Sequence, residues 1–366
     1  IFTCFSQQLM NSISNKIMNE FARKYPNVRV NFEIDTTSEY SIKLQTKLSA
    51  NDSDIDIFMI YFNIFDLSYM KSEALLDLNQ YEQITRCTSE MFDGVIRNCT
   101  YNGKLVGVPY RYAIQAWEVN EELLQKLGLG YPEKDWTWED FYEYAKKARQ
   151  DIDGDGIFDT YALSDNKEIF NMPIELYDNI FFNQLENKAL FDTEEYVNLL
   201  KLTKKINDEK LIYNEYKAEK KISKQNILFK PQIINMWMGD SSFILPPVLK
   251  SSKAYRTYDF ALFCINRNSK NADVAAEYLA SYLSKDIILT ESMVLSYEDI
   301  DYYKNAKSDN IIILDRKVSS EKNYNLIKEL VEYSKVNYLP WEIRKFKGEV
   351  IYNKFFNGEM TAEEAA

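Results

Sequence analysis

The chain has 366 residues, of which 46% are hydrophobic, so it is a globular chain long enough to form two domains. Its formal net charge of −12 argues against binding to nucleic acid or to an anionic membrane surface, because both require clustered lysine and arginine. The sequence contains no histidine, which excludes Ser-His-Asp and Cys-His nucleophilic sites, histidine-ligated zinc and histidine proton shuttles.

The start of the chain and its cysteines say less about its class and location. No apolar run approaches the roughly 18 residues of a membrane-spanning helix, and no signal peptide is present. The chain starts at Ile1 in a strand-like run without Met, so we expect an N-terminal segment to have been removed. Cys4 and Cys264 lie in apolar runs typical of buried strands. The spacing of Cys87 and Cys99 allows a disulfide but does not establish one.

The first sixty residues alternate between strand and helix patterns. An apolar strand over Ile1–Phe5 precedes a helical stripe that ends before Pro26. Val28–Phe32 alternates like a half-buried strand, and a second helical stripe follows Ser38. Ile55–Phe62 is an apolar run typical of a strand covered on both faces. This order predicts βαβ units and a mostly parallel sheet.

A crossover to a second lobe is predicted at Gly103–Tyr110, which concentrates two glycines and a proline in a glycine-poor chain. Leu105–Val108 reads as a short strand that stops at Pro109, and Arg111–Asn120 is an extended run into a new helix. Further elements are predicted along the rest of the chain. They are a capping-box helix opening at Trp136–Asp140, a helix over Thr193–Asn207, strands over Ile233–Met238 and Asp259–Ile265, a helix capped by Ser269–Asn271, and a capping box at Thr361–Glu364.

An acidic segment after the Trp136–Asp140 helix carries the clearest chemistry. Aspartates at positions one, three, five and nine, with glycine at six, match the start of an EF-hand-type calcium loop. Carboxylates packed this closely repel one another unless a cation neutralises them, and Ca²⁺ prefers oxygen ligands. The expected ligands of one Ca²⁺ are Asp151, Asp153, Asp155, Asp159 and the carbonyl of Ile157.

The same loop departs from the calcium pattern at position twelve, where Ala162 stands in place of a bidentate glutamate. A remote acid or water would have to complete the shell. The alternative is a solvated Asp/Gly turn, and the calcium interpretation is favoured only because the loop start is specific. The expected role of the ion is structural, bracing the helix Trp138–Arg149, because the loop lies well after the crossover and not at a strand end.

Seven blocks, in order along almost the whole chain, resemble family 1 extracellular solute-binding proteins, the maltose-binding-protein-like receptors of ABC importers. The blocks are Ile17–Val30, Asp54–Tyr61, Gly103–Pro109, Asn120–Leu129, Trp136–Phe141, Ile265–Leu279 and Phe356–Ala365. The resemblance implies a type II periplasmic-binding-protein-like fold, in which two α/β lobes close about a hinge over a ligand cleft. Lobe one is expected to hold residues 1–109 and 255–295, and lobe two residues 110–254 and 296–366.

The resemblance also implies partners and a location. The protein is expected to be a monomeric extracellular or periplasmic receptor without catalytic residues, which delivers a carbohydrate to the membrane subunits of an ABC importer. In a Gram-positive bacterium it would be a cell-surface lipoprotein whose anchoring cysteine lies upstream of Ile1. Some relatives carry a calcium loop after the helix that follows the crossover, which agrees with Asp151–Asp159.

The ligand site is expected where open α/β sheets bind ligands, beyond the carboxyl ends of their strands. Placed on the family pattern, the expected binding residues are Ser6, Gln7, Gln8, Tyr61, Phe62, Asn63, Tyr110, Arg111, Tyr112, Gly239, Asp240, Ser241, Trp341 and Glu342. Three aromatic rings would stack on a sugar, and four polar groups would bind its hydroxyls. The family often has aromatic residues where this chain has Cys4 and Ser241, so a ligand smaller or more polar than a maltodextrin is expected.

Other readings stay open at this point. The ligand could be a peptide or another polar solute, or the receptor could serve a membrane sensor without feeding an importer. A calcium-assisted polysaccharide lyase or hydrolase is less favoured, because the chain has no histidine and no specific catalytic motif.

Overall fold

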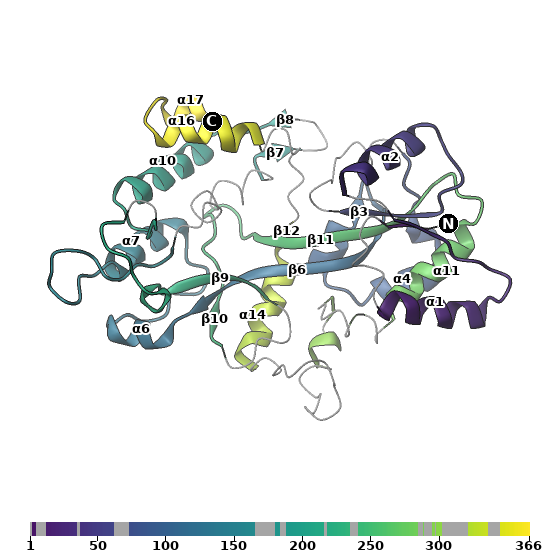
Figure 1. The fold of residues 1–366 in the computed structure, drawn as a ribbon, viewed down its shortest axis with the longest axis horizontal. Helices are drawn as coiled ribbons and strands as arrows, with labels where there is room; N and C mark the ends of the chain where they lie inside the picture. Colours follow the sequence, from purple (N-terminus) through teal and green to yellow (C-terminus); the bar gives the residue numbers. More distant parts are fainter. Residues whose placement is uncertain are drawn as a thin grey trace. The chain divides into compact units, whose positions relative to one another are not determined.

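The computed structural model describes residues 2–4, 12–34, 37–61, 73–164, 180–183, 188–215, 218–234, 241–284, 288, 295–296, 298–301, 321–335 and 345–366. The fold is mixed α/β (Figure 1). Across the described residues, no helix combines the length and the apolar character needed to cross a bilayer.

The helices, in chain order, are α1 (Ser12–Lys24), α2 (Thr37–Ser49), α4 (Glu82–Thr88), α5 (Asp93–Asn98), α6 (Glu121–Lys126), α7 (Trp138–Ala148), α10 (Glu194–Asp208), α11 (Ala272–Tyr282), α14 (Glu321–Glu332), α16 (Asn353–Phe356) and α17 (Ala362–Ala365). The strands are β1 (Phe2–Cys4), β2 (Phe32–Ile34), β3 (Ile57–Tyr61), β4 (Thr100–Tyr101), β5 (Lys104–Leu105), β6 (Val108–Val119), β7 (Phe182–Asn183), β8 (Lys188–Ala189), β9 (Phe229–Ile234), β10 (Phe243–Ile244), β11 (Tyr255–Ile265) and β12 (Ser334–Lys335). Short 3-10 turns cover Leu78–Gln80 and Lys224–Asn226, and a π-helical turn covers Lys347–Tyr352.

The chain divides into two compact units. Unit 1 comprises residues 1–113, 235–237 and 257–318, and unit 2 comprises residues 114–234, 238–256 and 319–366. Two of the passages between them lie inside β6, after Ala113, and inside β11, after Arg256. The sequence places these two boundaries at 109 and 255, and it assigns residues 296–318 to lobe two; of these, the described residues 296 and 298–301 group with unit 1.

The sheet of unit 1 has the parallel core that the alternating pattern predicts. β1 pairs in parallel with β2 on one side and with β3 on the other. The second half of β11 adds an antiparallel strand to β3, with Ala261 opposite Tyr61 and Ile265 opposite Ile57. α1 and α11 pack side by side, and their Phe21 and Tyr278 rings meet edge to face at 5.0 Å. Phe21 and Tyr278 are thus buried where the two helices meet.

Unit 2 is built around β6. β9 pairs antiparallel with it from Ile114 to Val119, and β10 pairs with it at Trp117 and Glu118. Trp117 is fully buried and contacts rings from α7, β9 and the segment before α7. The predicted capping box of α7 is present between Thr137 and Asp140. Burial of large aromatic rings makes this cluster the core that anchors β6 to α7.

Three strand predictions need correction. Pro109 does not end a strand but is the second residue of β6, a position that proline tolerates because the ladder has barely begun. β2 starts only at Phe32, so the alternation over Val28–Val30 belongs to an irregular segment. β9 begins at Phe229, earlier than the predicted Ile233, whose side chain is half exposed. Residues 235–238 of that predicted strand lie outside the described residues.

Candidate functional site

The structure describes only part of the predicted ligand site. Tyr61 is the last residue of β3, while Tyr110, Arg111 and Tyr112 lie in the unit 1 part of β6. Ser241 lies in unit 2, just before β10, where its carbonyl accepts a hydrogen bond from the Asn323 side chain at 3.0 Å. The remaining predicted residues lie outside the described residues: Ser6, Gln7, Gln8, Phe62, Asn63, Gly239, Asp240, Trp341 and Glu342.

Tyr112 is the predicted stacking residue whose side chain can be followed, and it is buried. Its hydroxyl accepts a hydrogen bond from the Asn98 side-chain amide at 2.9 Å, and its ring meets Phe260 edge to face at 5.6 Å. Only 7% of Tyr112 is exposed. In this structure the ring therefore packs against residues of unit 1, and its role as a stacking residue stays a prediction.

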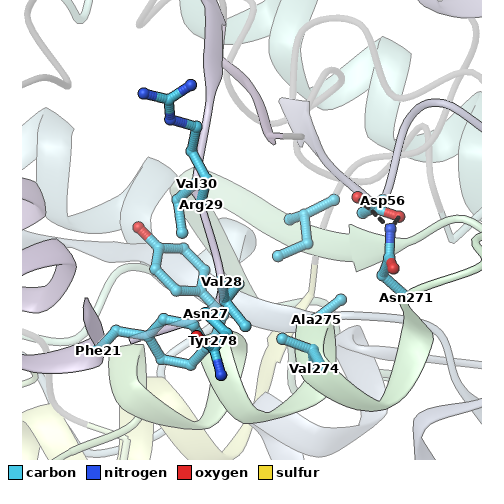
Figure 2. A pocket seen from close by; sticks show the side chains of 11 residues that line it. Phe21, Asn27, Val28, Arg29, Val30, Asp56, Asn271, Val274, Ala275 and Tyr278 are labelled. Carbon is cyan, nitrogen blue, oxygen red and sulfur yellow. Dashed lines mark hydrogen bonds between the residues drawn. The ribbon is translucent and has the colours of Figure 1, made fainter. Parts of the chain in front are cut away.

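A pocket of about 240 Å³ lies elsewhere in unit 1 (Figure 2). Asp56 and Asn271 are hydrogen-bonded at one end of it, and the rings of Phe21 and Tyr278 line the other. Asp56 directly precedes β3, so the pocket lies at the amino ends of the parallel strands, the edge opposite to Tyr61. This is not the edge at which the sequence places the ligand.

The polar residues at one end of this pocket are hydrogen-bonded to one another. Asp56 is only 6% exposed, and its carboxylate accepts hydrogen bonds from Ser269 Oγ at 2.6 Å and from the Asn271 amide at 3.3 Å. Asn271 is the N-cap residue of α11, yet its side chain makes no capping hydrogen bond and serves Asp56 instead. Asn271 thus occupies the predicted cap position but makes no capping hydrogen bond, because its amide stabilises the buried Asp56 carboxylate instead.

The predicted calcium loop adopts the turns that its aspartates and glycines indicate. Asp151 accepts the N–H groups of Gly154 and Gly156, both at 2.8 Å. Both glycines have positive φ, +74° and +83°, which other residues rarely adopt. Asp153 and Asp155 each accept the N–H two residues further on. These hydrogen bonds from backbone N–H groups to aspartate side chains curl the loop so that its carboxylates converge.

One carboxylate oxygen from each of Asp151, Asp153 and Asp159 lies within 4.8 Å of the other two. Lys220, from the segment before β9, reaches into this cluster. Its Nζ lies 2.7 Å from Asp153 Oδ2, 2.8 Å from Asp155 Oδ2 and 2.7 Å from Asp159 Oδ1. The loop therefore converges on a cation, and in this structure the cation is a lysine ammonium.

These contacts shift the ionisation of both partners toward the charged forms. Hydrogen bonds to Asp153, Asp155 and Asp159 raise the pKa of Lys220 above its ordinary value. The Lys220 ammonium, together with the Ile152 N–H, lowers the pKa of Asp159. Both pKa shifts favour the ion pair between the Lys220 ammonium and the Asp159 carboxylate.

Position twelve of the loop supplies no carboxylate, as the sequence indicates. Ala162 is fully buried, and its carbonyl accepts the Phe229 N–H at 2.8 Å, so position twelve joins the loop to β9 instead of supplying a carboxylate. Converging carboxylates fit a hard cation with oxygen ligands, although they lack the bidentate acid. The sequence predicted the acidic loop but missed Lys220, because Lys220 lies 67 residues from Asp153.

The cysteines that the structure describes in full, Cys87, Cys99 and Cys264, are free thiols, so the disulfide left open between Cys87 and Cys99 is not formed. Cys99 and Cys264 are fully buried, and burial raises the pKa of both thiols. Unreactive, apolar packing is the role indicated by these surroundings.

Comparison with known proteins identifies a family and a relative of this chain. A family model described as bacterial extracellular solute-binding protein matches residues 16–297. A curated relative, Lipoprotein LipO of Bacillus subtilis, is 30% identical over 161 residues. That match includes 40% of this chain, and the chain covers only 31% of the relative's length.

Solved structures match over the whole chain. A MalE sugar-binding protein from Xanthomonas citri superposes with a TM-score of 0.71 at 13% identity, and the match covers 100% of this chain and 93% of that one. A cyclic α-maltosyl-1,6-maltose binding protein from Arthrobacter globiformis gives 0.68 at 16%, covering 100% and 94%. An ABC substrate-binding protein from Listeria monocytogenes, in complex with cycloalternan, gives 0.63 at 19%, covering 100% and 94%. The fold is thus the two-lobed type II binding-protein fold.

Proposed function

Because the chain belongs to the bacterial extracellular solute-binding protein family, we propose that it captures a sugar or oligosaccharide and delivers it to an ABC importer. The observation that carries the proposal is full-length agreement of the fold with several sugar-binding proteins. These relatives are binding proteins, and the chain has neither histidine nor a specific catalytic motif, so no catalytic step is proposed. A cell-surface lipoprotein form is proposed by analogy with LipO, and palmitate labelling of the full-length protein tests it.

The proposed ligand site is the one expected from the sequence. Tyr61 and Trp341 would stack on a sugar ring, while Asn63, Arg111, Asp240 and Glu342 would bind hydroxyls. The position of Tyr61 at the carboxyl end of β3 supports this placement, because ligands of open α/β sheets bind at that edge. Tyr112 contributes indirectly, since its bonds to α5 and β11 hold β6 in place.

Ligand binding can be tested in two steps. A thermal-shift screen against mono- and oligosaccharides should find a compound that raises the melting temperature, because a ligand that binds only the folded state stabilises it by mass action. Calorimetry with that compound should then show that Trp341→Ala weakens binding by about 1–3 kcal/mol, the scale of a lost stacking anchor. Tyr131→Ala, which removes an exposed aromatic outside the proposed site, is the control. Unchanged affinity in both Trp341→Ala and Asp240→Ala would refute the site but not the fold.

We further propose that Asp151, Asp153, Asp155 and Asp159, with the carbonyl of Ile157, hold a structural Ca²⁺. The convergence of three carboxylates supports this, and bound Ca²⁺ would neutralise their charge. Millimolar Ca²⁺ should therefore raise the melting temperature relative to EDTA, and Asp153→Ala should abolish the difference. Mg²⁺ at the same concentration is the control, because it binds poorly to flexible all-protein loops. Identical melting curves in Ca²⁺ and EDTA would contradict the proposal.

A further inference from the structure

The Lys220 ammonium takes the central position among the carboxylates of the acidic loop, residues 151–159. Its three carboxylate contacts, of 2.7 to 2.8 Å, join it to the third, fifth and ninth positions of the loop. These are three of the positions at which an EF-hand-type loop uses side chains to bind its ion. An ordinary surface ion pair joins one ammonium to one carboxylate, so contacts with three carboxylates distinguish Lys220 from such a pair.

The segment that carries Lys220 is held near the loop by other contacts. Ile227 forms a bridge with Tyr161, directly after the loop, and the Leu228 N–H donates to the Tyr161 carbonyl at 3.0 Å. Upstream, the Ile222 N–H donates to the Tyr213 hydroxyl at 3.4 Å, and the Tyr213 ring lies 5.5 Å from the Tyr161 ring. Lys220 therefore enters the loop from a supported segment rather than as a free surface chain.

From this geometry we propose that Lys220 is the resident cation of the acidic loop, and that a divalent cation enters only by displacing the Lys220 ammonium. The proposal rests on the calcium site proposed above. Ca²⁺ lies about 2.3–2.6 Å from its ligand oxygens. An ion bound to Asp153, Asp155 and Asp159 would therefore occupy nearly the position of Lys220 Nζ, and the two charges would repel each other at contact distance.

Under this competition the loop has two charge-balanced states, one that holds Lys220 and one that holds a metal ion. The exchange between them sets the metal affinity of the loop. Without metal, Lys220 balances part of the aspartate charge and ties residues 218–222 to the loop. With metal, the same residues lose that tie while the loop stays neutralised. The lysine thus shifts the working range of the site toward high Ca²⁺ concentrations, since every ion that binds must first break three ionic contacts.

The test is calorimetric titration of the metal-free protein with CaCl₂. Lys220→Met should bind Ca²⁺ about tenfold more tightly than the wild type, or better, because it removes a competing charge at contact distance. Lys221→Met is the matched control: it removes the same charge one residue away, from an exposed side chain, and should change the affinity less than about twofold. In EDTA, Lys220→Met should also melt at a lower temperature than Lys221→Met.

A second measurement needs no variant. Hydrogen exchange of the wild-type protein should become faster in residues 218–222 and slower in residues 151–159 when Ca²⁺ is added. Equal Ca²⁺ affinity in Lys220→Met, Lys221→Met and the wild type would overturn the competition and leave the calcium site standing. Absence of Ca²⁺ binding in all three would overturn both proposals. Slower exchange in both segments would also overturn the displacement of Lys220.

Discussion

Asp140 fastens the first turn of α7 from two directions. Its Oδ2 accepts the Thr137 N–H at 2.8 Å and the Thr137 hydroxyl at 2.7 Å, while Thr137 Oγ1 accepts the Asp140 N–H at 3.2 Å. The bond from the Thr137 N–H contributes most to lowering the pKa of Asp140 below its ordinary value. The ionised carboxylate is therefore the form that stabilises the helix.

Asp140→Asn should lower the free energy of unfolding at pH 7 by roughly 0.5–2 kcal/mol, the range for a lost helix cap. Because the folded-state pKa is depressed, the stabilisation is present above the unfolded-state pKa of about 3.9 and is lost as the pH falls through the folded-state pKa. Variant and wild type should therefore converge in acid, as measured by urea unfolding at several pH values. Glu143→Gln, in an exposed pair with Lys146, should have little effect at any pH. A pH-independent gap for Asp140→Asn would contradict this account.

Residues near in sequence were predictable, and residues brought together by folding were not. The loop aspartates and the Thr137–Asp140 box follow fixed local spacings, so their turns could be read directly. Lys220 carries no such spacing relative to the loop, and the chain contains 44 lysines and arginines from which to choose. The surroundings of Tyr112 could not be predicted for a related reason: its place in an extended run could be read from the sequence, but its burial depends on Asn98 and Phe260.

At the scale of elements, periodic helices were predicted better than strand ends. The helix predicted over Thr193–Asn207 is α10, which differs from it by one residue at each end, and its Tyr196, Leu199 and Leu200 are all buried. Strand ends depend on which neighbour is available for pairing. Pro109 fits β6 although proline usually ends a strand, and β9 starts at Phe229 because β6 extends as far as Val119 to pair with it.

α10 is joined to the π-helical turn Lys347–Tyr352 by buried polar contacts. The Tyr196 and Tyr352 hydroxyls share a hydrogen bond of 2.6 Å in the core. The Lys347 ammonium lies 3.5 Å from the centre of the Phe191 ring and 4.6 Å from that of Tyr196. The two hydroxyls bond to each other and the ammonium lies over aromatic rings, so these contacts help to orient the C-terminal helices on α10.

Tyr196→Phe should lower the free energy of unfolding by about 1–3 kcal/mol, because it leaves the buried Tyr352 hydroxyl without this partner. The double variant Tyr196→Phe/Tyr352→Phe removes both hydroxyls and should cost no more than the single change. Urea unfolding of wild type, both singles and the double variant completes the cycle. Strictly additive losses would show that the two hydroxyls do not stabilise the fold through each other.

At the scale of the molecule, two of the passages between the units lie within long strands. β6 has 12 residues and β11 has 11, and each changes unit partway along its length. These two connections have no flexible linker composition, so we expect motion between the units to involve backbone angles near Ala113 and Arg256, as well as the other points at which the chain changes unit. Hinge closure over a ligand is the motion expected for this fold.

Closure makes a prediction that does not depend on which residues bind the sugar. A ligand identified in the thermal-shift screen, at about 100 times its Kd, should stabilise the folded protein by about 2.7 kcal/mol. If part of the binding free energy drives closure, small-angle X-ray scattering should show a smaller radius of gyration with the ligand than without it. A sugar that does not raise the melting temperature serves as the control for solvent contrast. A ligand that stabilises the protein by the expected amount but leaves the scattering curve unchanged would mean that capture occurs without hinge motion. Delivery to an importer would then require a different signal of occupancy.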